Sequence, residues 1–297
     1  MSTLVLILAT GLGLGALYFL VASGLSLIYG LMGVLNCAHG AFLVAGAYAA
    51  WWAVENLPGA GPQGWGFVLA TTVGVAVGAV LGAVVELVLI RPLYRRHIEQ
   101  VLVTVGLGLA GVALAQGIFG SDPLPFPRPG WAAGTTPVLG ATVPNDRFLL
   151  VGAAVVLLLA LVALLRFTRI GLVIRAGVEN RAMVEALGID VRRAFTLVFA
   201  IGGAAAALGG VLGSVYLSQV SPGQGTSLLI FAFIVVVIGG MGSLTGTAVA
   251  SVVVGLVQQL ANYYGASGVG DFSVVLLLAL VLLVRPAGLL GGTAAHA

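Results

Sequence analysis

The sequence predicts an all-α fold, a polytopic helical membrane protein whose bundle crosses the bilayer about eight to ten times. Hydrophobic residues make up 60% of the 297 residues, charged residues only 7%, and the mean hydropathy is +1.18. A chain with so little polar surface cannot cover a soluble globule. Uncharged runs long enough for a helical span recur from end to end. Runs such as residues 227–237 do not alternate polar and apolar residues, as barrel strands would.

The composition also excludes several functions. All 12 basic residues are Arg, so the chain cannot form the G-x-x-x-x-G-K-[ST] loop with which many ATPases bind phosphate. Cys37 is the single cysteine, and the three histidines lie far apart in sequence, which predicts no internal disulfide, metal site or cofactor. There is no H-E-x-x-H motif and no Ser/His pairing in a G-x-S-G context, so we expect no enzyme. We also expect no nucleic-acid partner, since the arginines lie at the ends of spans.

The arginines set the topology through the positive-inside rule. Only Arg128 and Arg147 fall in or beside the Pro/Gly-rich segment 121–146, which is then external. The other ten belong on the cytoplasmic side, although some could be interfacial anchors without partners. This predicts an external amino end, an internal carboxy end and nine spans: 4–24, 38–54, 66–90, 100–119, 147–165, 194–217, 227–241, 245–264 and 271–284. Residues 24–37 are left open as a further short or re-entrant helix.

The first two spans need a break between them. The opening "MSTLVLILATGLGLGALYF" lacks the basic region of a secretory signal, so 4–24 is expected to be a retained span. One straight helix over residues 4–53 would be about 75 Å long, more than twice the hydrocarbon thickness. Glycines and a predicted N-cap, Asn36, favour a turn. Irregular backbone at this depth is buried in protein or lines a cavity, so Asn36 and His39 either close a turn or border a translocation path.

Small residues at every fourth position mark the packing faces of three later spans. The stripes predict close helix contacts; they consist of Gly74, Gly78 and Gly82, of Gly202, Ala206, Gly210 and Ser214, and of Gly242, Gly246 and Ala250. Glu86 continues the first stripe and should therefore face protein. A carboxylate there is costly unless paired, so we predict an ion pair between Glu86 and Arg91, with a proton or ion relay as the alternative.

The segment 168–194 is the longest charged stretch and is predicted to be a cytoplasmic loop. Within it Glu179 to Leu187 reads as a short helix that Gly188 ends. Its apolar face, Met183, Ala186 and Leu187, has nothing in this loop to pack against. The segment could lie on anionic headgroups through its arginines, or it could dock a partner protein.

Five motifs in family order resemble the membrane subunits of high-affinity branched-chain amino acid ABC transporters, the LivH type. They are "GLSLIYGLMGVLNCAHGAFLVAGAY" (24–48), "ELVLIRPLYRR" (86–96), "FGSDP" (119–123), "GGMGSLTG" (239–246) and "RPAGLLGG" (285–292). Departures from the family pattern include Cys37, where Phe is frequent, Ala41, where an acidic or small residue is usual, and Leu87, where the family has Arg.

The resemblance implies a single transmembrane permease domain over 1–297, in the inner membrane of a bacterial cell. It implies that the loop 168–194 carries a coupling helix for an ATP-binding subunit, formed by Glu179, Asn180, Arg181, Ala182, Met183, Glu185, Ala186, Leu187 and Gly188. The implied partners are two ATP-binding subunits, a second homologous permease, an external solute-binding protein and the lipid bilayer. Two alternatives stay open: a permease of the same family for urea or short-chain amides, and a proton-coupled secondary transporter.

Overall fold

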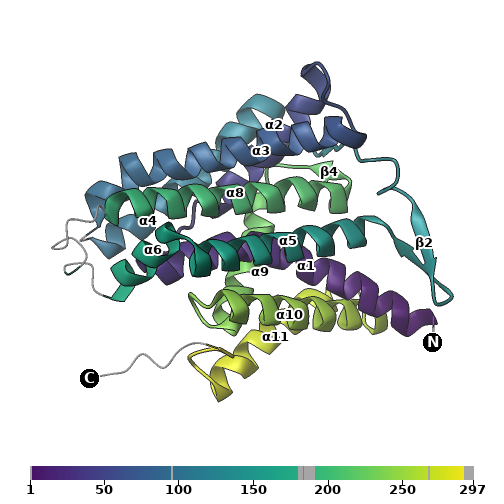
Figure 1. The fold of residues 1–297 in the computed structure, drawn as a ribbon. Helices are drawn as coiled ribbons and strands as arrows, with labels where there is room; N and C mark the ends of the chain where they lie inside the picture. The colour runs from purple at the N-terminus through teal and green to yellow at the C-terminus, as the bar shows by residue number, and fades with distance from the viewer. Residues whose placement is uncertain (1, 95, 180–182, 184–190, 267, 291–297) are drawn as a thin grey trace.

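The computed structural model describes residues 2–94, 96–179, 183, 191–266 and 268–290, and most of them lie in helices (Figure 1). The predicted all-α membrane fold is confirmed. Within these residues the helices are α1 (Ser2–Met32), α2 (His39–Asn56), α3 (Gly64–Val85), α4 (His97–Phe119), α5 (Asp146–Phe167), α6 (Arg169–Glu179), α8 (Val191–Leu217), α9 (Gln224–Gly239), α10 (Leu244–Tyr264) and α11 (Val269–Val284). Each of the nine predicted spans falls on one of them.

Six of the described helices are long and apolar enough to cross a membrane. They are α1, α3 with its extension to Leu93, α4, α5, α8 and α10. Helices α9 and α11 are apolar but only 16 residues long. A π-helical turn, Glu86–Ile90, and a 3-10 turn, Arg91–Leu93, carry the end of α3 into the link to α4.

The predicted external segment 121–146 contains short strands that the sequence did not reveal. Strands β2 (Thr135–Val138) and β3 (Ala141–Pro144) form a hairpin. Leu139 and Gly140 join them, both with positive φ, as two-residue hairpin loops require. Strand β1 (Leu124–Pro125) pairs antiparallel with β4 (Gln219–Val220), which follows α8. The segment is therefore fastened to the end of the bundle.

Helix α1 is longer than the predicted span 4–24, because it continues without interruption to Met32. Residues 24–32 therefore form no separate helix. The break that follows is where the glycines suggested it, with Gly33 at φ +65°. Asn36 is not the N-cap of α2. That position is Ala38, and the Asn36 side chain accepts a hydrogen bond from its N–H at 3.1 Å.

Helix α8 lies at the centre of the bundle, against α1, α2 and α3 (Figure 1). The small-residue stripes are at these contacts, as predicted. A Cβ atom at Gly78 or Gly82 would collide with backbone oxygens of α8, and one at Gly210 would meet the backbone of α2. At Gly242, a Cβ would lie 2.6 Å from a Cα atom of α1. Backbones approach closely here because no larger side chain intervenes.

The two ends of the bundle differ in charge. The start of α1 lies at the end that carries the β2–β3 hairpin, and α6 lies at the opposite end (Figure 1). This arrangement agrees with the predicted external amino end, because the arginines of α6 and of the α3–α4 link then share the cytoplasmic side.

Candidate functional site

A polar cavity of about 540 Å³ opens at the external end, between α1, α9 and α10. One part of its wall is apolar, formed by Leu14, Leu17, Leu217, Leu228 and Phe231. The other part is polar, formed by Tyr18, Tyr216, Gln219, Ser221, Gln224, Ser227, Gln258, Gln259 and Asn262. Of the described residues that line it, none carries a formal charge. The cavity therefore suits a small molecule with both a polar and an apolar part.

Two hydrogen-bonded groups hold the polar wall in place. The Tyr18 hydroxyl donates to Gln258 Oε1 at 2.6 Å, and Gln258 Nε2 donates to Asp271 Oδ1 at 2.8 Å, linking α1, α10 and α11. On the other side Gln224 Nε2 donates at 3.2 Å both to the carbonyl oxygen of Gly210 and to Ser214 Oγ. Buried polar side chains are stable only when bonded in this way.

The Tyr216 ring at the cavity wall is backed by a cation. The Arg147 guanidinium lies over this ring, 3.7 Å from its centre, and is paired with Asp146 at 3.1 Å. This stacking fixes the ring and keeps the charge of Arg147 behind it. Arg147 therefore contributes to the wall without lining the cavity.

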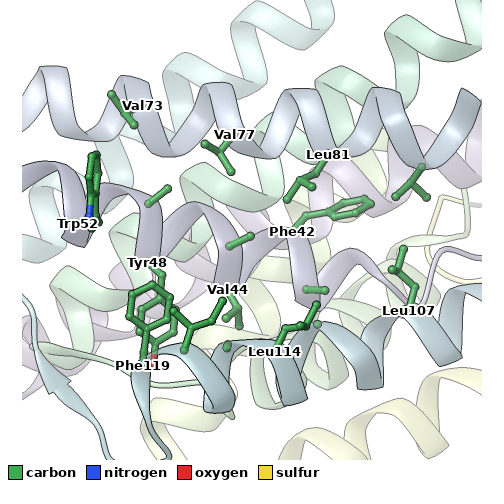
Figure 2. A pocket seen from close by; sticks show the side chains of 17 residues that line it. Phe42, Val44, Tyr48, Trp52, Val73, Val77, Leu81, Leu107, Leu114 and Phe119 are labelled. Carbon is green, nitrogen blue, oxygen red and sulfur yellow. The ribbon is translucent and has the colours of Figure 1, made fainter. Parts of the chain in front are cut away.

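A second cavity, of about 520 Å³, lies between α2, α3 and α4 and is almost wholly apolar. Figure 2 shows Phe42, Tyr48 and Trp52 of α2 between side chains of α3 and α4, with Val77 and Leu114 among them. It offers little for an ionic solute to bind, because its lining is aliphatic and aromatic. The polar cavity is thus the better candidate for the transported molecule.

The break between α1 and α2 is deep inside the protein. His39 Nε2 lies 2.9 Å from the carbonyl oxygen of Val21, and the residues from Val21 to the end of α1 at Met32 span about 16 Å. Thr104 of α4, which is fully buried, serves the irregular backbone: its Oγ1 accepts from the N–H of Cys37 at 3.3 Å, and its single hydrogen is shared between the carbonyl oxygens of Val101 at 3.0 Å and Leu35 at 3.4 Å. This satisfies backbone groups that could not otherwise lie at membrane depth.

Asn36 and His39 themselves are completely buried, and they line neither of the two cavities. Among the described residues, Asn36 Nδ2 and His39 Nδ1 have no hydrogen-bond partner. The structure therefore places both side chains at the break, as expected from the sequence, but apart from the polar cavity.

The structure brings Glu86 and Arg91 together, with Arg91 Nη2 3.3 Å from Glu86 Oε2. The carboxylate is fully buried and accepts two further hydrogen bonds, one from the Tyr94 hydroxyl and one, at 2.6 Å, from Thr196 Oγ1. Arg91 Nη2 also donates to Thr196 Oγ1 at 2.8 Å. Thr196 belongs to α8, so this cluster joins the end of α3 to the first turns of α8.

The expected coupling helix lies largely outside the described residues. Glu179 is the last residue of α6, and Met183 has a side chain that is 64% exposed. The positions 180–182 and 184–188 are not described. Residues 169–179, expected to belong to a loop, are helical and pack on α5 and α8. The cluster of Glu86 and Thr196 lies at the start of α8, directly after the undescribed part of this segment.

Sequence reasoning missed most of the polar cavity. Tyr18, Gln224 and Gln258 are isolated polar residues in apolar helices, 34 or more positions apart, and only the packing brings them together. Gln224 and Gln258 did carry a signal, because a Gln inside a membrane span is costly and needs a hydrogen-bond partner.

A tightly packed helical bundle with an uncharged polar cavity at one end fits a membrane permease. Comparison of the sequence with known proteins leads to the same class. The chain belongs to the family described as "Branched-chain amino acid transport system / permease component", which matches residues 7–285. It is accordingly a multi-pass permease of the inner membrane, as the motifs predicted.

Several characterised relatives cover nearly the whole chain. It is 30% identical to the high-affinity branched-chain amino acid transport system permease protein LivH of Escherichia coli K12, over 95% of this chain and 93% of that one. It is 30% identical to the corresponding protein BraD of Pseudomonas aeruginosa, over 96% and 94%. The fructose import permease protein FruF of Bifidobacterium longum is 26% identical, over 94% and 77%. No solved structure matches the chain.

Proposed function

We propose that this chain is the membrane-spanning subunit of an ATP-driven importer for branched-chain amino acids. The observation that carries the proposal is the polar cavity, whose lining combines aliphatic side chains with uncharged polar ones. A branched-chain amino acid is a zwitterion with an aliphatic side chain. Its aliphatic part matches the apolar wall, and its ammonium and carboxylate groups, whose charges sum to zero, match the uncharged polar wall. The names of the amino acid permeases LivH and BraD support the same cargo.

The energy source is proposed to lie on other subunits. The chain has no Lys for a phosphate-binding loop, so two separate ATP-binding subunits would supply hydrolysis. They would dock on the segment 179–188 at the cytoplasmic end. The hydrogen-bonded cluster of Glu86, Arg91 and Thr196 supports this role, because it ties the start of α8, which follows that segment, to the end of α3 and would transmit a push from it. A second permease and an external solute-binding protein would complete the assembly.

Asn36 and His39 are proposed to border the path when it opens. Each has a buried nitrogen without a partner among the described residues, which costs on the order of 1–3 kcal/mol. Such atoms are explained if a passing solute or water completes their hydrogen bonds in another state of the transport cycle.

The proposal is tested by uptake into proteoliposomes that contain this chain, its neighbouring permease and two ATP-binding subunits, with the solute-binding protein outside. We expect uptake of radiolabelled leucine that requires internal ATP and persists when the proton gradient is collapsed. Uptake that needs the gradient and not ATP would establish a secondary transporter instead. Urea, acetamide and fructose serve as competing cargoes, and transport of one of these in place of leucine would overturn the amino acid assignment.

A further inference from the structure

The polar wall of the external cavity is oriented by a chain of hydrogen bonds that ends on a carboxylate. Asp271 can only accept, so it fixes which end of the Gln258 amide is Nε2. The Gln258 Oε1 atom must then face Tyr18, and the Tyr18 hydroxyl donates its hydrogen to it. Tyr18 and Gln258 are only 3% and 4% exposed, so water does not compete for these bonds.

This orientation leaves the cavity with an acceptor. The hydrogen of Tyr18 is occupied by Gln258, so the hydroxyl oxygen can offer only its lone pairs to a solute. Across the cavity, Gln224 Nε2 donates to Gly210 and Ser214, and its Oε1 is the accepting end, which lies 3.3 Å from Ser214 Oγ and keeps a second lone pair. The Asp271 charge behind Gln258 polarises the chain of bonds and strengthens the accepting character of the Tyr18 oxygen.

The surroundings favour a cation at this position. The Tyr18 ring stacks on that of Phe231, with 5.1 Å between the ring centres, and both rings line the cavity. Aromatic faces attract ammonium groups. The nearest arginine on this wall, Arg147, is held behind Tyr216 by its stacking and by Asp146, so no lining residue of the described chain repels a positive charge.

We propose that Tyr18, positioned by Gln258 and Asp271, accepts a hydrogen bond from the ammonium group of an α-amino acid in this cavity. The inference rests on the proposed function and deepens it, because it assigns the recognition of the amine to a residue of the permease. Selection for an amine would then act twice, once on the solute-binding protein and once inside the membrane.

The test is independent of transport. In the assembled transporter, Cys37→Ala removes the native thiol and Ser227→Cys places a near-isosteric thiol at the cavity wall. The rate at which a water-soluble thiol reagent labels this cysteine is measured with rising L-leucine or with 4-methylpentanoate, which has the same carbon skeleton but no amine. We expect leucine to slow labelling and 4-methylpentanoate to have little effect.

Tyr18→Phe keeps the ring and removes the accepting oxygen, and it should raise the leucine concentration needed for protection about tenfold. Tyr48→Phe is the matched control, since Tyr48 lines the apolar cavity and its hydroxyl has no partner among the described residues. Equal protection by both compounds, no protection, or protection unchanged by Tyr18→Phe would overturn the inference. Amine-dependent protection without ATP-driven uptake would instead leave the inference intact and remove the proposed function.

Discussion

Single polar residues in this protein are stabilised by partners that lie far away in sequence. Glu86 is fully buried within an apolar bundle, and it is tolerated because Arg91, Tyr94 and Thr196 all donate to it. Thr104 plays a similar part for the backbone of Leu35 and Cys37. Removing one partner of such a group leaves the other unsatisfied, which costs more than the bond itself contributes.

Asn36 and His39 are the residues at which a functional role is most directly measured. If they border the open path, Asn36→Ala and His39→Ala should each lower the rate of ATP-driven leucine uptake roughly tenfold or more, the effect of losing one hydrogen bond to a charged solute. The matched controls are Asn56→Ala and His97→Ala, which alter exposed residues of the same types. Normal uptake kinetics in both buried variants, with unchanged amounts of transporter, would show that the two side chains only shape the turn.

Helices in this bundle are held together by surface shape more than by polar contacts. Gly78 and Gly82 place the backbone of α3 directly on that of α8, and a Cβ atom at Gly74 would meet the carbonyl oxygen of Gly46 in α2. By contrast most of α4 is exposed at the surface of the bundle, and glycines such as Gly117 have open space beside them. A glycine therefore contributes to helix packing on α3 but not at Gly117 of α4.

This difference gives a paired prediction. Gly78→Leu should prevent α3 from seating on α8 and lower the thermal midpoint of the detergent-purified protein by roughly 10 °C or abolish its folding, because overpacking of a tight contact costs several kcal/mol. Gly117→Leu, in an apolar helix of similar length, should change the midpoint by no more than about 2 °C. Fluorescence-detected size-exclusion chromatography after heating measures both. Equal midpoints for the two variants would show that the α3–α8 contact contributes little to stability.

Much of the architecture could be predicted from the sequence, since hydropathy, arginine placement and glycine spacing are local signals. These located nine of the described helices, six of them long and apolar enough to cross a membrane, and the face of α3 on which Glu86 lies. The continuation of α1 to Met32 could not be predicted, because glycines permit a break without fixing its position. The polar cavity was missed for a different reason. Its members, among them Tyr18 and Gln258, are 240 residues apart and meet only when the bundle is packed.

For the molecule as a whole, the question is how force from the cytoplasm would reach the external cavity. Helix α8 is the continuous element, because its first turns bond Glu86 and its last turns hold Gln224 and Tyr216 of the cavity wall. A rigid 27-residue helix transmits displacement over about 40 Å. The undescribed residues 184–190 lead directly into it, so a partner that grips this segment would act on α8.

Met183 lies directly before residues 184–190, and its exposed apolar side chain allows docking to be tested. Met183→Asp should leave the chain in the membrane and abolish leucine uptake, since a carboxylate at an apolar contact must be desolvated without a partner. The control is Leu290→Asp, which changes an exposed leucine after the end of α11. Co-purification of the ATP-binding subunits is measured along with uptake. Undiminished uptake by the Met183 variant would contradict the docking assignment.

The π-helical turn at Glu86–Ile90 has a consequence for variation in chain length. Such a turn accommodates one residue more than an α-helix would use, and each residue of a helix advances the side-chain direction by about 100°. Because a π-helical turn brings residues i and i+5 to one face, as an α-helical turn does for residues i and i+4, deleting Val88 would restore ordinary winding and leave Arg91 on the face of Glu86. A one-residue deletion in this turn is therefore expected to be tolerated better than one inside Gly64–Val85, where the α-helical side chains on the two sides of the deletion would be rotated by about 100° relative to one another.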